Sequence, residues 1–432
     1  MKRGKYIQSG IGQSSETDEE IAVEDAISKA QSHLSREPTF TIVYTDYRLD
    51  QKKIAKQINK KLGKENWVGM TVDKHFNSHH EYARDTNISV LCIASDYVHF
   101  SVAYSKRYQK NARKKGSKTI TEAVNNMHST KNLDSYIAFN KLRNKDYMHL
   151  IRENQFLAMT FLSSAQYINN KETSGAEVDF VEGMVDVLGM AVPIFGGGAG
   201  SNFIEFIEKQ KGYSHQFAHG KCLKNSAVVV FCVSNLHFEV DVNHSYQITD
   251  QFARITKLDK TGNEILEINY KEPIQEYCRL IGVPKKKYLK DPSYYSLTRP
   301  FGIATWDGKT FVKEALPNED GKTFHSTLRT SHDMIINIMK HDEKKLRENL
   351  KDLLVEAKKK GPVGLAMVAS CSTRRYLLGD NVVEKHKLAT KHAKNVPFFG
   401  SFVFSEIGAT KTSRTAVHGE SITSLIFYDK LL

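Results

Sequence analysis

A cysteine and two arginines directly after an apolar run are the residues of this sequence best placed to do chemistry. In GLAMVASCSTRRYLLG these are Cys371, Arg374 and Arg375. A guanidinium at a strand end can hold a carboxylate through two parallel hydrogen bonds. Its charge would also lower the pKa of the neighbouring thiol and make it nucleophilic or redox-sensitive. The alternative is a buried structural cysteine beside an arginine that pairs with an internal acid.

Glu406 is the acid that we expect to accompany Arg374. It follows the apolar stretch PFFGSFVFS and precedes Gly408, so it should lie just past the end of a strand. A carboxylate there could accept the amino group of an amino acid whose own carboxylate is held by the arginine. The alternative is an acid that stabilises a turn. Both interpretations predict that Arg374 and Glu406 lie close together.

The stretch VPIFGGGAGSN is a third candidate, through Gly196, Gly197, Gly198, Gly200 and Asn202. It lacks the lysine of a phosphate-binding loop, and its Gly-x-Gly-x-Gly order is not the dinucleotide fingerprint. Glycine permits tight turns and close approach of the backbone. We therefore predict a sharp bend at a strand end, whose N–H groups either pack against a neighbouring unit or face a small anion.

Two histidines, His219 and His418, each precede a glycine. Turn chemistry is the simplest account of both, and haem ligation is the alternative, because a single axial histidine has no sequence signature of its own. No other cofactor and no metal site is predicted. No Gly-x-Ser-x-Gly elbow and no set of acid, base and nucleophile can be recognised, so we expect a binding protein rather than an enzyme.

Composition narrows the class of protein. The 432 residues suggest two or three domains, and 40% hydrophobic content is sufficient for sizeable cores. The net charge is +13, but lysine is plentiful throughout, so we do not expect nucleic acid as a partner. No apolar run approaches the roughly 18 residues of a membrane span, and no secretory signal is recognised. We therefore expect a cytoplasmic protein that does not insert into membranes.

Strand and helix patterns alternate along the chain and predict an α/β fold of mixed sheets with flanking helices. We expect a flexible segment at 1–20 and a basic insertion at about 104–154. Three stretches have an apolar pair, a glycine and then a long apolar strand, and they contain Gly69, Gly196 to Gly200 and Gly400. This spacing predicts loosely repeated strand-helix units, with chance matching of short apolar runs as the alternative.

The order of these motifs resembles the FIST family (F-box and intracellular signal transduction domains) over roughly residues 21–430. The matching stretches are PIFGGGAG, QFAHGKCLKNSAVVVF, ITKLDKTGNEILEINYKEPIQEYCRLIG, GLAMVASCSTRRYLLG and FFGSFVFSEIG. Ser405 departs from the pattern, because a glycine usually precedes the glutamate.

The resemblance implies an N-terminal FIST-like part at 21–265 and a C-terminal one at 266–432. It further implies a sensory protein of signal transduction that binds a small polar molecule, such as an amino acid, and passes its state to a separate protein partner. The alternatives are a haem-based nitric-oxide or gas sensor and a protein-interaction adaptor without a ligand.

Overall fold

The computed structural model describes residues 4–79, 82, 85–129, 155–164, 166–168, 171–173, 176–209, 212–305, 308–326, 330–409 and 415–432. Over these residues the fold is mixed α/β, which confirms the predicted fold class. The basic stretch expected at 104–154 is described as far as residue 129, where it comprises the end of a strand and a helix. Its remainder lies outside the described residues.

A strand-helix-strand-helix-strand unit occurs three times along the described chain, which confirms the predicted repetition. The first repeat contains β1 (Gln8–Ser14), α1 (Glu19–Ser32), β2 (Phe40–Asp46), α2 (Gln51–Leu62), β3 (Trp67–Val72), β4 (Lys74–Asn77) and β5 (Ile88–Ala94). The second contains β6 (Val98–Lys106), α3 (Ala112–Ser129), β7 (Phe156–Ser163), β8 (Gln166–Ile168), β9 (Lys171–Thr173), α6 (Ala176–Leu188), β10 (Ile194–Ala199), α7 (Phe203–Lys209), β11 (His215–Ala218), β12 (Lys221–Lys224) and β13 (Ser226–Ser234). The third contains β14 (Leu236–His244), α11 (Glu343–Lys360), β22 (Val363–Cys371), α12 (Ser372–Leu378), α13 (Asn381–His392), β23 (Phe398–Val403), β24 (Glu406–Gly408), β25 (Ala416–His418) and β26 (Ser421–Leu431).

The three repeats build their sheets in the same order. The strands run β1-β5-β2-β3, β6-β13-β7-β10 and β14-β26-β22-β23. The last two strands of each series are parallel, and the other pairs are antiparallel. Each sheet is then extended by a short strand from another repeat: β11 joins β3, β24 joins β10 and β4 joins β23. This exchange binds the repeats into one cyclic body.

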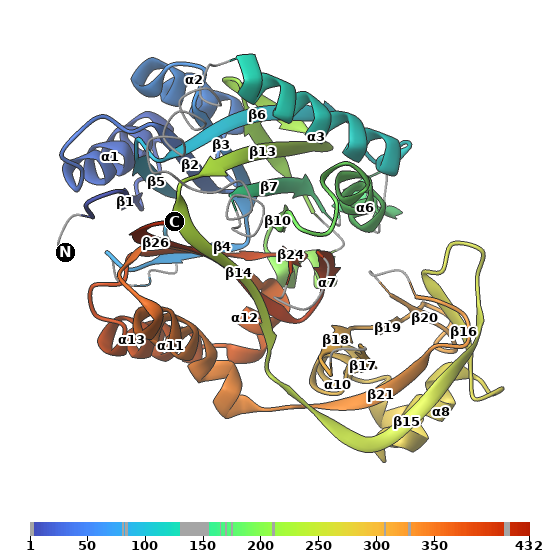
Figure 1. Ribbon diagram of the computed structural model, residues 1–432. Coiled ribbons are helices and arrows are strands. Elements are labelled where there is room, and N and C mark those ends of the chain that lie inside the picture. The colour runs from blue at the N-terminus through green and yellow to red at the C-terminus, as the bar shows by residue number, and fades with distance from the viewer. Residues whose placement is uncertain are drawn as a thin grey trace.

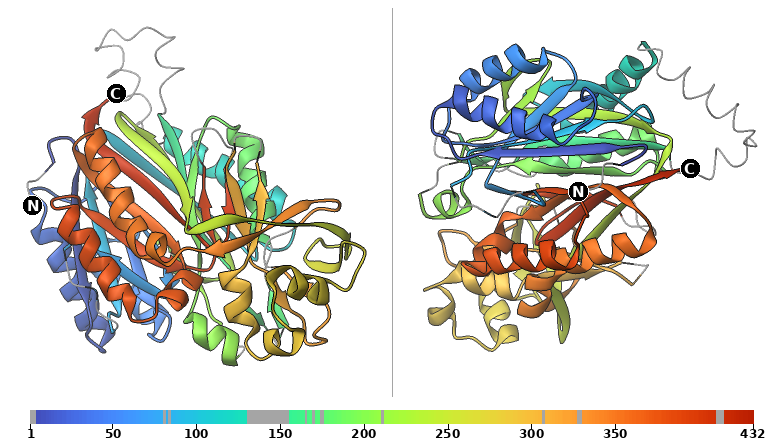
Figure 2. Two further views of the ribbon diagram at one scale, coloured as in Figure 1. Left: turned by 90° about the horizontal axis from the view of Figure 1, so that it is seen from below. Right: turned by 90° about the vertical axis from the view of Figure 1, so that its left-hand side faces the viewer.

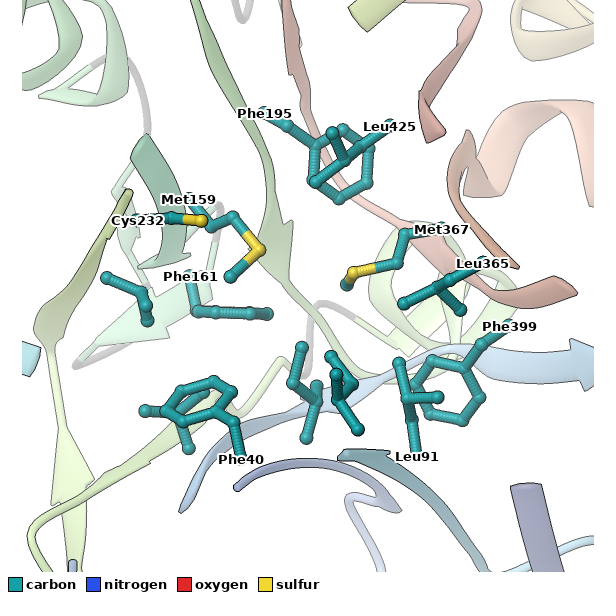
Figure 3. Close-up of a cluster of buried hydrophobic side chains, with 14 of the residues drawn as sticks. Phe40, Leu91, Met159, Phe161, Phe195, Cys232, Leu365, Met367, Phe399 and Leu425 are labelled. Carbon is teal, nitrogen blue, oxygen red and sulfur yellow. The ribbon is translucent and has the colours of Figure 1, made fainter. Parts of the chain in front are cut away.

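The apolar faces of the three sheets meet in a shared core. Figure 3 shows Phe40 and Leu91 from the first sheet, Phe161 from the second, and Leu365 and Phe399 from the third packed around one interior, where all are buried. The helices cover the outer faces, and those of the first and third repeats lie on opposite sides of the body (Figure 2). Alternation of side chains along each strand places one face in this shared core and the other under helices.

A separate module is inserted between β14 and α11, in the third repeat. It contains β15 (Tyr246–Leu258), β16 (Glu264–Ile268), α8 (Pro273–Ile281), α9 (Lys285–Tyr288), α10 (Pro292–Thr298), β17 (Phe301–Ala304), β18 (Thr310–Lys313), β19 (Leu316–Pro317), β20 (Phe324–His325) and β21 (Ile335–His341). The module has its own hydrophobic core, around Tyr277 and Phe324. The paired strands β15 and β21 connect it to the body, as Figure 1 shows.

The glycine-rich segment is a strand, and the predicted sharp bend is wrong. None of Gly196, Gly197, Gly198 and Gly200 has a positive φ, and β10 is paired on both sides. A Cβ at Gly196 would lie 2.1 Å from the carbonyl oxygen of Thr160 on β7. Glycine is therefore needed here for close approach of two backbones, which the sequence could not distinguish from a need for a turn.

The amide groups of this strand are used by neighbouring segments. Gly198 donates to the carbonyl of Ser405 at 2.9 Å, and Gly200 donates to that of Thr71 at 3.2 Å. These bonds favour packing against neighbouring repeats over anion binding. Asn202 caps α7 through its Oδ1, which accepts from the backbone of Glu205 at 3.1 Å.

Residues 1–20, expected as a flexible segment, contain β1. This strand pairs with β5 in register from Gln8 opposite Ala94 to Ser14 opposite Ile88. The segment therefore provides the edge strand of the first sheet, as β6 and β14 do for the other two.

Candidate functional site

Three of the residues singled out from the sequence come together at the carboxyl end of β22. Cys371 ends this strand, Arg374 lies in the first turn of α12, and Glu406 begins β24. All three are buried, and Arg374 and Glu406 are 0% exposed. Ligand sites in α/β sheets commonly lie at the carboxyl ends of strands. The sequence thus located a buried, charged cluster at a position where such sites occur.

Arg374 links the body to the root of the inserted module. Its Nη2 donates to Ser245 Oγ at 3.1 Å, and its Nη1 donates to the carbonyl oxygen of Glu420 at 3.4 Å. Its Nε is buried and has no hydrogen-bond partner among the described residues. Burial lowers the pKa of Arg374, and the negative groups around it, including Glu406, oppose that shift.

Arg374 and Glu406 lie close together, as predicted, but they do not form an ion pair. The neighbouring Arg375 forms an ion pair instead, with its Nε and Nη2 at 2.7 and 2.9 Å from the carboxylate of buried Asp73. Asp73 directly follows β3, so this bidentate pair fastens α12 to the first repeat. The sequence pointed to an arginine–carboxylate pair at this place and named the wrong partners.

Glu406 is held by the start of β26. Its Oε2 accepts from the backbone N–H of Ser421 at 3.0 Å and from Ser421 Oγ at 2.9 Å. Its Oε1 is buried without a hydrogen-bond partner among the described residues. Burial raises the pKa of Glu406 well above its usual range.

Two residues that sequence reasoning missed complete the cluster. Glu420 has φ 53° and is 0% exposed, and its Oε2 lies 2.6 Å from the hydroxyl of Tyr246. The same hydroxyl lies 2.9 Å from the carbonyl oxygen of Leu297 on α10. Burial, with Glu314 nearby, raises the pKa of Glu420 to about 8. Glu420 stands in a visible His-Gly-Glu step, but no local signal connects Tyr246 with it.

Of the two interpretations of Cys371, the structure favours the buried structural cysteine. Burial, reinforced by Glu406 and Glu420, raises the pKa of the Cys371 thiol well above its ordinary value. The hydroxyl of Thr373 donates to its Sγ at 3.0 Å. A buried thiol among carboxyl groups holds its proton, so this cysteine is not a ready nucleophile.

A cavity of about 370 Å³ adjoins this cluster, between the third repeat and the β17–β18 hairpin of the module. Tyr246 and Ser421, the hydrogen-bond partners of Glu420 and Glu406, both line it. The full lining consists of Val242, Asn243, His244, Tyr246, Ile248, Thr305, Gly308, Lys309, Thr310, Phe311, Val312, Lys345, His418, Gly419 and Ser421.

The two histidines occupy different environments. His219 lies at the β11–β12 turn with φ 47°, and its Nδ1 is 2.7 Å from Glu65 Oε2. The ring of His418 stacks on Phe311 with a centroid separation of 4.7 Å, and its Nε2 lies 3.3 Å from the carbonyl of Gly408. Burial lowers the pKa of His418 to about 4.

The two His-Gly steps do not occupy equivalent positions in their repeats. Cys222 lies opposite Phe217 and Val417 lies opposite Ile407, so His418 corresponds to Leu223 of the second repeat. The existing contacts of both rings do not favour haem ligation. The described residues contain no group of three or more His, Cys, Asp or Glu side chains that could hold a metal ion.

The body and the inserted module define a two-part α/β protein with a polar cavity between the parts. Residues 39–271 match the FIST N domain, and residues 273–409 match the FIST C domain. The chain belongs to the FIST family, whose domains are generally sensory domains of signal transduction.

One curated relative is an uncharacterized protein, MJ1623, of Methanocaldococcus jannaschii. It is 26% identical over 194 residues, which cover 42% of this chain and 36% of the relative. The match therefore spans about a third of that protein's own length. Among the described residues of the present chain, no helix has the length and apolar character required to cross a bilayer.

Proposed function

We propose that this chain is a sensory protein that binds a small polar molecule in the cavity between the third repeat and the inserted module. One observation carries the proposal: two lining residues, Tyr246 and Ser421, are hydrogen-bonded to buried glutamates of the charged cluster. A cavity with a few converging polar groups is the usual form of a small-molecule site. The carboxyl groups lie behind the lining, so they influence a ligand without filling the cavity.

The lining suits a ligand the size of an amino acid. Phe311 and Val312 provide apolar surface, and Lys309 and Lys345 bring positive charge to the lining. A zwitterion could place its carboxylate toward a lysine and its ammonium toward Ser421 and Tyr246. This orientation differs from the one expected from the sequence, because the Nη atoms of Arg374 are already engaged with Ser245 and Glu420.

Signal output would come from movement of the inserted module. Tyr246 contacts Glu420 of the body through the same hydroxyl that reaches Leu297 of the module. A ligand at this boundary changes the contacts that set the position of the module, and ligands shift conformational equilibria through such differential contacts. The changed surface would then be read by a separate protein partner.

A thermal-shift screen of amino acids and related small polar molecules tests this proposal. Binding stabilises the folded protein by RT ln(1 + [L]/Kd), so the midpoint of unfolding rises as the ligand concentration increases above Kd. Ser421→Ala should abolish the shift, whereas Ser226→Ala, at the equivalent position of the second repeat, should preserve it. No shift with any such compound, or equal shifts in both variants, would contradict a site at this cavity.

A further inference from the structure

The second and third repeats place different chemistry at equivalent positions. Gln216 lies one residue before Phe217, which pairs with Gly69, and Glu406 lies one residue before Ile407, which pairs with Gly196. Each side chain accepts from the backbone N–H of the serine that begins the next long strand. That distance is 3.2 Å from Ser226 to Gln216 and 3.0 Å from Ser421 to Glu406.

A second pair of positions differs in the same way. Asn225 and Glu420 directly precede these serines and share a left-handed backbone, with φ 49° and 53°. The second repeat therefore holds an amide at both positions, and the third holds an acid at both. Neutral side chains satisfy the fold in the second repeat, so the acidity of Glu406 and Glu420 is not required for the architecture.

The third repeat consequently buries carboxyl groups where the second repeat buries amides. Glu314, Glu406 and Glu420 act on one another electrostatically, and within this part of the described structure Arg374 is the guanidinium that faces them. Glu406 Oε1 and Glu420 Oε1 are buried without hydrogen-bond partners among the described residues. Buried carboxyl groups in this arrangement gain from a cation brought close to them.

The cavity lining offers the means to receive such a cation. Ser421 Oγ donates to Glu406 at 2.9 Å, and the Tyr246 hydroxyl lies 2.6 Å from Glu420. A hydroxyl that donates its proton to a carboxylate keeps lone pairs that accept from another donor. An ammonium group carries three donors, and both residues belong to the lining of one cavity.

We propose that the cavity selects ligands by a primary ammonium group, which Tyr246 and Ser421 accept in front of Glu406 and Glu420. This inference rests on the proposed function and names the ligand group that its site requires. The shared chemistry is the ammonium, whether it belongs to a simple amine or to an amino acid. The second repeat lacks the acids at the equivalent positions and should not discriminate in this way.

Proton release should accompany binding. Where a glutamate is protonated before binding, an ammonium held by the hydroxyls in front of it favours the ionised carboxylate, so that R–NH3+ stays intact and the carboxyl group releases one proton to solution. The titratable and charged groups that face the two glutamates are Tyr246, Glu314, Cys371 and Arg374. Affinity should then rise with pH up to about the pKa of Glu420, which burial raises to about 8. The rise is up to about tenfold per pH unit for each proton released.

The test is calorimetric titration of the full chain with n-butylamine, 4-aminobutyrate and butyrate at pH 6, 7 and 8. The two ammonium compounds should bind at least about tenfold more tightly than butyrate. Their binding enthalpy should vary with the ionisation enthalpy of the buffer, which reports the released proton. Glu406→Gln combined with Glu420→Gln should remove both the ammonium preference and the pH dependence. Tyr246→Phe should weaken the ammonium compounds selectively, and Gln216→Glu is the matched control that leaves binding unchanged.

The outcomes separate the two proposals. Butyrate binding as tight as that of n-butylamine, or an ammonium preference that survives in the double glutamine variant, overturns the ammonium inference and leaves the cavity as a ligand site. Failure of all three probes together with failure of the amino-acid screen overturns the proposed function as well.

Discussion

The second and third repeats share strand order, register and a serine that starts the long final strand, yet only the third carries acids beside that serine. The first repeat has an equivalent position, which is His75. This residue pairs with Ser401 in the same register in which Gln216 pairs with Met70 and Glu406 pairs with Gly197. Burial lowers the pKa of His75 to about 3, so this position is neutral in the first repeat as well. Two neutral copies show what the fold requires, and the acidic copy adjoins the cavity.

This difference separates structure from function within one chain. The repeats of one chain can be compared directly with each other. The amides of the second repeat are neutral analogues of the protonated acids at the equivalent positions of the third. A buried polar side chain needs a hydrogen-bond partner, and both Gln216 and Glu406 accept a hydrogen bond from a serine N–H. The charge of the third repeat is then best explained by what binds beside it.

Removing Arg374 should have the largest effect, because its fully buried guanidinium lies among the acids of the third repeat and bonds to the root of the inserted module. Arg374→Leu leaves the buried carboxyl groups without their guanidinium and removes the bonds to Ser245 and Glu420. We expect a loss of about 3–5 kcal/mol in the free energy of unfolding, measured by chemical denaturation. Arg113→Leu is the exposed control and should lose less than about 1 kcal/mol. Equal losses in the two variants would contradict this account.

Introducing an acid into the second repeat should reproduce the energetic cost of a buried carboxyl group without creating a ligand site. Gln216→Glu places a carboxyl group at a 0% exposed position that is not part of the lining of the candidate cavity. An ionised, poorly compensated carboxylate there should cost about 3 kcal/mol at pH 8, with a smaller loss at pH 5 where the acid can stay protonated. Denaturation at the two pH values measures the difference. A loss independent of pH would indicate a steric cause instead.

Substitutions of glycines at equivalent strand positions test whether the repeats share the same backbone packing, independently of charge. A Cβ at Gly69 would meet the carbonyl oxygen of Val43 at 2.2 Å, much as one at Gly196 would meet that of Thr160. We expect Gly69→Ala and Gly196→Ala to lose about 1–3 kcal/mol each, because adjacent strands must move apart. Gly361→Ala, where the nearest atom would be 3.5 Å away, is the control and should stay within about 0.5 kcal/mol. A large difference between the first two variants would weaken the equivalence of the repeats.

The smallest effect is expected at Cys371. The equivalent residue of the second repeat is Ser163, because β22 pairs with β23 as β7 pairs with β10. Cys371→Ser should change the free energy of unfolding by less than about 1 kcal/mol, because a hydroxyl already occupies the equivalent place. In the folded protein, iodoacetamide should modify Cys371 more slowly than the half-buried Cys222. Faster modification of Cys371 would restore the reactive-thiol interpretation.

The sequence predicted the fold class, the repetition and the grouping of Cys371, Arg374 and Glu406, because each depends on local patterns that end at strand termini. It could not predict Ser245 and Tyr246, which reach the cluster from the root of an inserted module more than 100 residues before Arg374. It also misjudged Gly196, since close backbone approach and a tight turn both favour glycine. The thiol pKa of Cys371 depended on burial and on acids that only the folded arrangement brings near.

The central claim is that the acids of the third repeat serve binding rather than folding. Its most direct test is the free energy of unfolding of Glu406→Gln combined with Glu420→Gln, compared with the unchanged protein between pH 5 and 8. Folded Glu420 keeps its proton up to about pH 8, because burial raises its pKa above the unfolded value of about 4.5, so the unchanged protein should lose stability as pH rises through this window. We predict that the variant is at least as stable at pH 8 and has a flatter pH dependence. A variant less stable by more than about 2 kcal/mol at pH 8 would contradict the claim, because the acids would then be structural.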